Sequence, residues 1–110
     1  MITETPPSLI GTWEGVVTQG ASEYAVTVDL RGADVGEAAG SATYPSLSCT
    51  SELTLIDGTP RIVHMDEAIL TGTCVPTTVT LTLQPDGALQ YSFQSSFGSD
   101  PGSGSLIRKQ

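Results

Sequence analysis

Hydrophobic and polar residues alternate along most of this chain, which is the pattern of strands that bury one face. Residues 24–30 read Tyr-Ala-Val-Thr-Val-Asp-Leu, so every second side chain is a bulky apolar one. No window of eleven or more residues carries apolar positions at the 3.6-residue spacing of a helix. The alternation therefore predicts strands only, at Gly11–Gln19, Glu23–Arg31, Val35–Tyr44, Cys49–Ile56, Arg61–Thr71, Thr77–Gln84, Ala88–Gln94 and Ser103–Arg108.

The breaks between these segments are short and contain glycine, proline and aspartate, as in Asp57-Gly-Thr-Pro60. Short connections favour antiparallel pairing of successive strands and leave no room for helical crossovers. We expect an all-β fold in which eight strands close into an up-and-down barrel, and a two-sheet sandwich is the alternative. The barrel domain is expected over residues 10–110, after a disordered or loosely ordered arm at residues 1–9.

The third predicted strand carries small residues at every second position from Gly36 to Ala42. If this face points inward, it leaves space inside the barrel, and a ligand could occupy that space. The alternative is that bulky neighbours such as Tyr24 and Phe93 fill the gap.

The fifth predicted strand contains an acidic residue on its apolar face. Val63, Met65 and Ile69 share that face with Glu67, whereas His64 and Asp66 share the outer face, where we expect a solvated pair. A buried carboxylate without partners is costly. Glu67 is therefore either hydrogen-bonded by tyrosine hydroxyls or backbone N–H groups, or it is a ligand anchor or a general acid–base.

Strand direction brings further polar side chains towards the barrel end opposite Trp13. Gln19, Tyr24 and Tyr44 fall at that end, and each tyrosine has the alternative role of a core residue with a satisfied hydroxyl. A closed apolar base with a polar rim is what a small-molecule pocket requires. The expected ligand-binding residues are Gln19, Tyr24, Tyr44, Glu67, Tyr91 and Phe93.

Composition excludes several classes of partner. The net charge of −8 over 110 residues argues against nucleic acid and anionic lipid as partners, and 38% hydrophobic residues argue against disorder. One histidine and two cysteines leave little for a metal site, so we expect neither metal nor cofactor. No apolar stretch is long enough for membrane insertion, and residues 1–7 lack a signal-peptide pattern. The chain is then either cytoplasmic or a piece of a larger exported protein.

Gly11-Thr-Trp13 at the start of the first strand and Arg108 at the end of the last resemble the calycin signature of lipocalins and avidins. The resemblance implies a barrel-closing contact in which the arginine packs on the tryptophan, worth roughly 0.5–2 kcal/mol. Avidins surround biotin with several tryptophans, and this chain has one, which disfavours biotin as the ligand.

A second resemblance covers nearly the whole chain. The matching motifs are Gly-Thr-Trp-Glu-Gly (11–15), Gln19, Val35-Gly36, Tyr-Pro-Ser-Leu (44–47), Cys49, Leu-Thr-Leu (53–55), Glu67, Gly-Thr-Cys (72–74) and Gly-Ser-Leu-Ile-Arg (104–108). They are similar to a small actinobacterial module, often found C-terminal to a serine/threonine kinase and a membrane anchor. The resemblance implies an extracytoplasmic sensor or binding module, with a kinase or anchor domain as a partner in a parent protein.

Cys49 and Cys74 fall at the same end of a meander, so a disulfide between them is geometrically plausible. The alternative is a reactive thiol or a metal pair, which would need a nearby base or further ligands. A disulfide would favour an oxidising compartment.

These observations predict non-catalytic binding of a small apolar or amphipathic molecule. One alternative is a cyclase or isomerase of a natural-product pathway, in which Glu67, Tyr24, Tyr44 and Tyr91 would orient or protonate the substrate. Another is a structural or protein-interaction module with a filled core.

Overall fold

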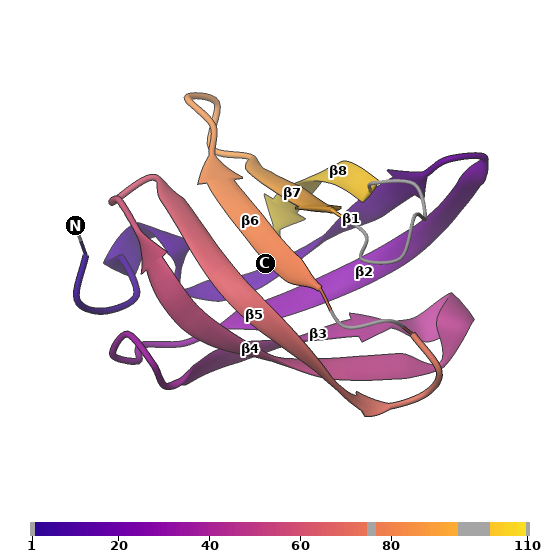
Figure 1. The fold of residues 1–110 in the computed structure, drawn as a ribbon. Helices are drawn as coiled ribbons and strands as arrows, with labels where there is room; N and C mark the ends of the chain where they lie inside the picture. Colours follow the sequence, from indigo (N-terminus) through magenta and orange to yellow (C-terminus); the bar gives the residue numbers. More distant parts are fainter. Residues whose placement is uncertain (1, 75–76, 95–101, 110) are drawn as a thin grey trace.

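Eight antiparallel strands form a closed barrel in the computed structural model, which describes residues 2–74, 77–94 and 102–109 (Figure 1). Each strand pairs with the next along the chain, and the last pairs with the first, so no sheet edge is left open. This confirms the predicted barrel and excludes the two-sheet sandwich. The strands are β1 (Gly11–Gln19), β2 (Ser22–Leu30), β3 (Ala38–Tyr44), β4 (Cys49–Gly58), β5 (Ile62–Thr71), β6 (Thr78–Leu83), β7 (Leu89–Gln94) and β8 (Gly102–Arg108).

The barrel has two distinct ends. Trp13 pairs with Arg108 where β1 begins and β8 ends, and we call this the Trp13 end. The opposite end, where Tyr44 pairs with Cys49 across the β3–β4 connection, we call the disulfide end. In Figure 1 the Trp13 end lies to the left, beside the N-terminus, and the disulfide end lies to the right.

Side chains that alternate inward from the strands form the core, as the hydrophobic pattern predicts. Trp13 and Tyr91 are the largest of the fully buried side chains. Inward positions predicted from the alternation that are at most 1% exposed are Val26, Val28, Leu53, Leu55, Val63, Met65, Val79, Leu81, Leu89 and Tyr91.

The third strand differs from its prediction. It begins at Ala38, because Val35 and Gly36 lie in the β2–β3 loop, where Gly36 has φ +94°. The register then shifts between Ala38 and Gly40, as in a β-bulge. Ala39, which strict alternation would place on the face opposite Gly40 and Ala42, is fully buried. The predicted inward face of small residues therefore holds only from Gly40 onward.

Residues 2–9 were expected to form a loose arm, but they pack against the Trp13 end. Leu9 is fully buried and Thr5 is 3% exposed. The indole N–H of Trp13 donates to the Leu9 carbonyl at 3.0 Å, which fixes the segment where it enters β1. The apolar side chain of Leu9 thereby covers the end of the core.

Helix is confined to two 3₁₀ turns in the described residues, η1 (Pro7–Leu9) and η2 (Pro45–Leu47). No helix formed by these residues has the length and apolar character needed to cross a membrane.

Candidate functional site

Glu67 points into the barrel, as its place on the apolar face of β5 predicts. It lies opposite Leu53 of β4 and is only 6% exposed. Its neighbours on the same face, Val63 and Met65, are fully buried. A carboxyl group in such a setting needs hydrogen-bond partners to offset its lost hydration.

One carboxyl oxygen of Glu67 has two such partners. The hydroxyl of Tyr44 donates to Oε2 at 2.5 Å, and that of Ser51 donates to the same atom at 2.9 Å. Tyr44 also shares a hydrogen bond with the hydroxyl of Tyr91. Because Tyr44 gives its one proton to Glu67, Tyr91 is the donor in that bond when the carboxyl is ionised. The result is a chain of donors from Tyr91 through Tyr44 to Glu67.

Ser51 was missing from the predicted site. It is fully buried on β4, where it precedes Leu53 and Leu55 on the inward face. A serine in the apolar phase of a strand is the signal that could have identified it.

The remaining predicted residues join the same cluster. Tyr24 donates to Gln19 Oε1 at 3.1 Å, and its ring meets that of Tyr44 edge to face with centroids 5.8 Å apart. The rings of Tyr91 and Phe93 meet in the same way at 5.9 Å. The structure thus brings together all six residues predicted to bind a ligand.

The second carboxyl oxygen of Glu67 is different from the first. Oε2 takes both side-chain hydrogen bonds of this carboxyl, and Oε1 takes none in the part of the chain that the structure describes. Within that part, every fully buried side-chain nitrogen or oxygen atom has a partner. Oε1 therefore keeps contact with accessible space.

Burial sets the protonation of this cluster. Desolvation raises the pKa of Glu67 above its ordinary value, and the hydrogen bonds from Tyr44 and Ser51 offset only part of that rise. Desolvation likewise raises the pKa of Tyr24, Tyr44 and Tyr91, with the charge of Glu67 adding to each shift. All three phenols stay protonated at neutral pH and serve as hydrogen-bond donors.

The predicted barrel-closing contact is present at the Trp13 end. Arg108 lies over the Trp13 ring and donates to the carbonyl oxygens of Ile10 and Ser8. At the other end Cys49 and Cys74 form the expected disulfide, with Cα atoms 6.3 Å apart. This excludes the alternatives of a reactive thiol or a metal pair for these two cysteines.

His64 does not pair with Asp66 as expected. Its Nδ1 lies 3.1 Å from the Thr80 hydroxyl, and its Nε2 lies 4.0 Å from Asp57 Oδ1. A register shift between Leu55 and Asp57 brings Asp57 opposite His64, which the alternation alone did not show. His64 and Asp57 are both well exposed, so the outer-face assignment of His64 is correct.

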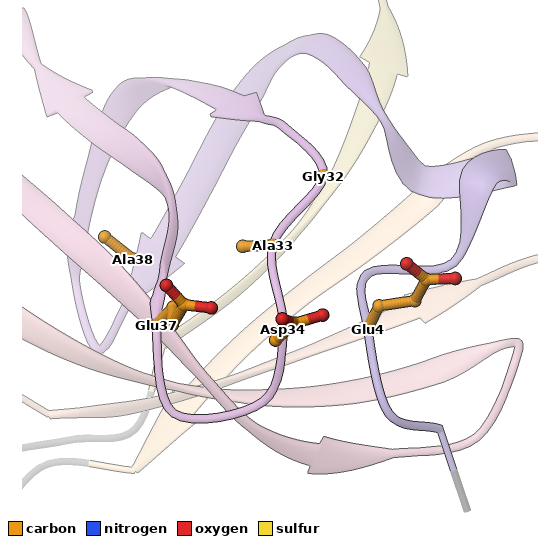
Figure 2. Close-up of a pocket in the computed structure, with 6 residues that line it drawn as sticks. All are labelled: Glu4, Gly32, Ala33, Asp34, Glu37 and Ala38. Carbon is orange, nitrogen blue, oxygen red and sulfur yellow. The ribbon is translucent and has the colours of Figure 1, made fainter.

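A shallow hollow of about 460 Å³ lies beside the N-terminal segment at the Trp13 end (Figure 2). Sequence reasoning did not identify it, because it joins residues from the N-terminal segment and the β2–β3 loop. The residues that line the hollow are Glu4, Gly32, Ala33, Asp34, Glu37 and Ala38.

No group of three or more histidine, cysteine or acidic side chains in the described ranges is arranged to hold a metal ion.

Comparison with protein-family models, curated proteins and solved structures finds no significant match to this chain.

Proposed function

We propose that the barrel binds a small, largely apolar molecule at the disulfide end, without catalysis, and that the molecule presents one hydrogen-bonding group to Glu67. The observation that carries this proposal is the asymmetry of the carboxyl group. Oε2 is held by Tyr44 and Ser51, whereas Oε1 has no described partner and keeps contact with accessible space. A fixed polar group with one open position among apolar side chains is typical of a small-molecule site.

The surroundings of Glu67 support an apolar ligand. Tyr24 packs on Tyr44, and Phe93 packs on Tyr91. Both Tyr24 and Phe93 are only partly buried, so their rings offer apolar surface within the same cluster. The opposite end is closed by Leu9 and Trp13, which are almost fully buried. A ligand would therefore enter from the disulfide end.

The fixed hydrogen bonds of the site support binding of one polar group in a defined orientation. Tyr44 and Tyr91 are engaged in one hydrogen-bond chain, and burial raises the pKa of both phenols. Such groups hold a fixed pattern of donors and acceptors at neutral pH.

The disulfide supports a setting outside the cytoplasm, because such bonds persist in oxidising compartments. The resemblance to the actinobacterial module points the same way, and the proposed context is a sensor or binding module beside a kinase or anchor domain. The calycin-like signature of Trp13 and Arg108 supports the same class of ligand-binding barrel.

Titration of the ¹⁵N-labelled protein with 1-octanol, followed by amide chemical shifts, tests the proposal. We expect saturable shifts at the disulfide end, around Tyr24, Glu67 and Phe93, while amides near Trp13 stay unchanged. The absence of saturable shifts up to the solubility limit would overturn the proposal and favour a structural or interaction module with a filled core. Shifts scattered over the outer face would overturn it as well.

A further inference from the structure

We infer that the ligand carries a protonated amine, whose N–H group binds Glu67 Oε1. This inference rests on the proposed function and narrows it to one chemical class, an ammonium group attached to an apolar body. It follows from the distribution of charge and aromatic rings around the carboxyl group.

Every basic side chain of the protein lies away from Glu67. The chain has four lysine and arginine residues, and the strand directions bring all of them to the Trp13 end. The single histidine, His64, is on the outer face, where it contacts Thr80. The protein therefore supplies no cation to its buried carboxyl group. The four residues are Arg31, Arg61, Arg108 and Lys109.

The hydrogen bonds to Glu67 favour its ionised form, but they leave the negative charge without a partner of opposite sign. Tyr44 and Ser51 are neutral donors and both act on Oε2. An ammonium N–H at Oε1 would make a charge-assisted hydrogen bond and balance the charge, which a neutral donor would not do. Removing a buried charge from water is costly without a partner of opposite sign, so a cationic ligand gains most here.

The aromatic side chains near the carboxyl group suit the same ligand. Two edge-to-face ring pairs, Tyr24–Tyr44 and Tyr91–Phe93, are linked to Glu67 by the hydroxyls of Tyr44 and Tyr91. Aromatic faces attract ammonium groups through their negative quadrupole, and their apolar surface suits an alkyl body. A carboxylate among aromatic rings is thus complementary to an amine and unsuited to an anion.

Acidic side chains on the outer face also favour a cationic ligand. Glu23 is the second residue of β2 at this end, Glu52 lies near the start of β4, and Asp66 lies near the middle of β5. With a net charge of −8, the protein attracts cations and repels anions as they approach.

A matched set of ligands tests the inference in the wild-type protein. n-Octylamine, 1-octanol and sodium octanoate share an apolar chain and differ in their head groups. At about pH 8 the amine is protonated and carries a positive charge. Titrations monitored by amide shifts should give an affinity for octylamine roughly tenfold or more above that for octanol. Octanoate should bind more weakly than octanol.

A pair of variants assigns this preference to Glu67. In Glu67→Gln the preference for octylamine over octanol should disappear, while octanol should still bind. The matched control is Glu23→Gln, which removes one negative charge at the same end and should keep the preference. The amide spectrum of each variant shows whether it is folded, and the wild-type ligand series needs no variant at all.

The outcomes separate the two proposals. Binding of octanol at the disulfide end with no preference for the amine would overturn the amine inference and leave the proposed function intact. Failure of all three ligands to bind there would overturn both. A preference that survives in Glu67→Gln would also overturn the assignment to this carboxyl group.

Discussion

Arg108 lies over the indole of Trp13, with its Cζ atom 4.4 Å from the ring centroid. The same guanidinium donates to the Ile10 carbonyl at 2.7 Å and to the Ser8 carbonyl at 2.8 Å. One side chain at the end of β8 thus joins the start of β1 to the N-terminal segment. It closes the barrel at the point where the first and last strands meet.

Arg108→Lys should destabilise the protein by about 1–3 kcal/mol, because an ammonium cannot stack as a plane and reach two carbonyls in a fork. Urea unfolding of the wild type and the variant measures this loss. Arg31→Lys is the matched control, since Arg31 is exposed at the same end. Equal stability of the two variants would contradict a role for the guanidinium geometry.

Much of this fold could be predicted because inward and outward residues alternate strictly on most strands. The Trp13–Arg108 contact was implied by the resemblance to the calycin signature, and barrel closure agrees with it, since the first and last strands of a meander barrel must pair. The inward position of Glu67 followed from its place among Val63 and Met65. For Glu67 a period of two was enough to predict the inward position.

The errors arise where that period breaks. A bulge at Ala39 shifts the inward face of β3, and another irregularity near Asp57 gives His64 a different neighbour. A one-residue shift moves a side chain to the other face, and local composition does not reveal it. The partners of Glu67 depend on contacts across the barrel, so sequence could suggest the tyrosines but not the order of the hydrogen bonds.

Gly40→Ala should destabilise the barrel by about 1–3 kcal/mol or more, by overpacking. A Cβ atom at Gly40 would lie 2.0 Å from the backbone oxygen of Asp29, and backbone cannot move aside cheaply. At Gly32 the nearest atom would be 3.8 Å away, on Ile10, which is an ordinary contact. Thermal unfolding should therefore show a large loss for Gly40→Ala and little change for Gly32→Ala, and similar losses would count against this account.

Replacing both Cys49 and Cys74 by alanine should cost about 3.5 kcal/mol, since the bridge spans 25 residues and restricts the unfolded chain. Urea unfolding of the double variant beside the wild type measures this difference. Thiol titration of the unreduced wild type provides the control and should detect no free thiol. A double variant as stable as the wild type would show that the bridge contributes little.

Tyr44→Phe should destabilise the protein by about 2–4 kcal/mol, because Glu67 loses a donor and the Tyr91 hydroxyl loses its acceptor, both in the interior. Tyr24→Phe is the matched control. Tyr24 is only partly buried, so the loss should stay below about 1 kcal/mol. Denaturant unfolding at neutral pH compares the two variants. An equal loss of stability would mean that the buried hydrogen bonds of the Tyr44 hydroxyl contribute no more than that of Tyr24.

The raised pKa of Glu67 predicts a pH-dependent stability. Burial raises this pKa in the folded state above its ordinary value of 4.5, so the folded protein holds the proton more tightly than the unfolded chain. The stability that this group contributes is fully present below about pH 4.5 and is lost as pH rises through the raised pKa. The phenols of Tyr24, Tyr44 and Tyr91 face the same site and remain protonated across this range, because burial raises their pKa values.

Glu67→Gln removes the titrating group and retains a similar shape. The unfolding free energy of the wild type minus that of Glu67→Gln should therefore decrease as pH rises above about 4.5 and through the raised pKa of Glu67. Subtracting the two proteins cancels the contribution of the other carboxyl groups, and urea unfolding at a series of pH values gives each difference. Glu23→Gln controls for the loss of one negative charge at the same end. A difference that stays constant or increases with pH would mean that the pKa of Glu67 is not raised in the folded protein.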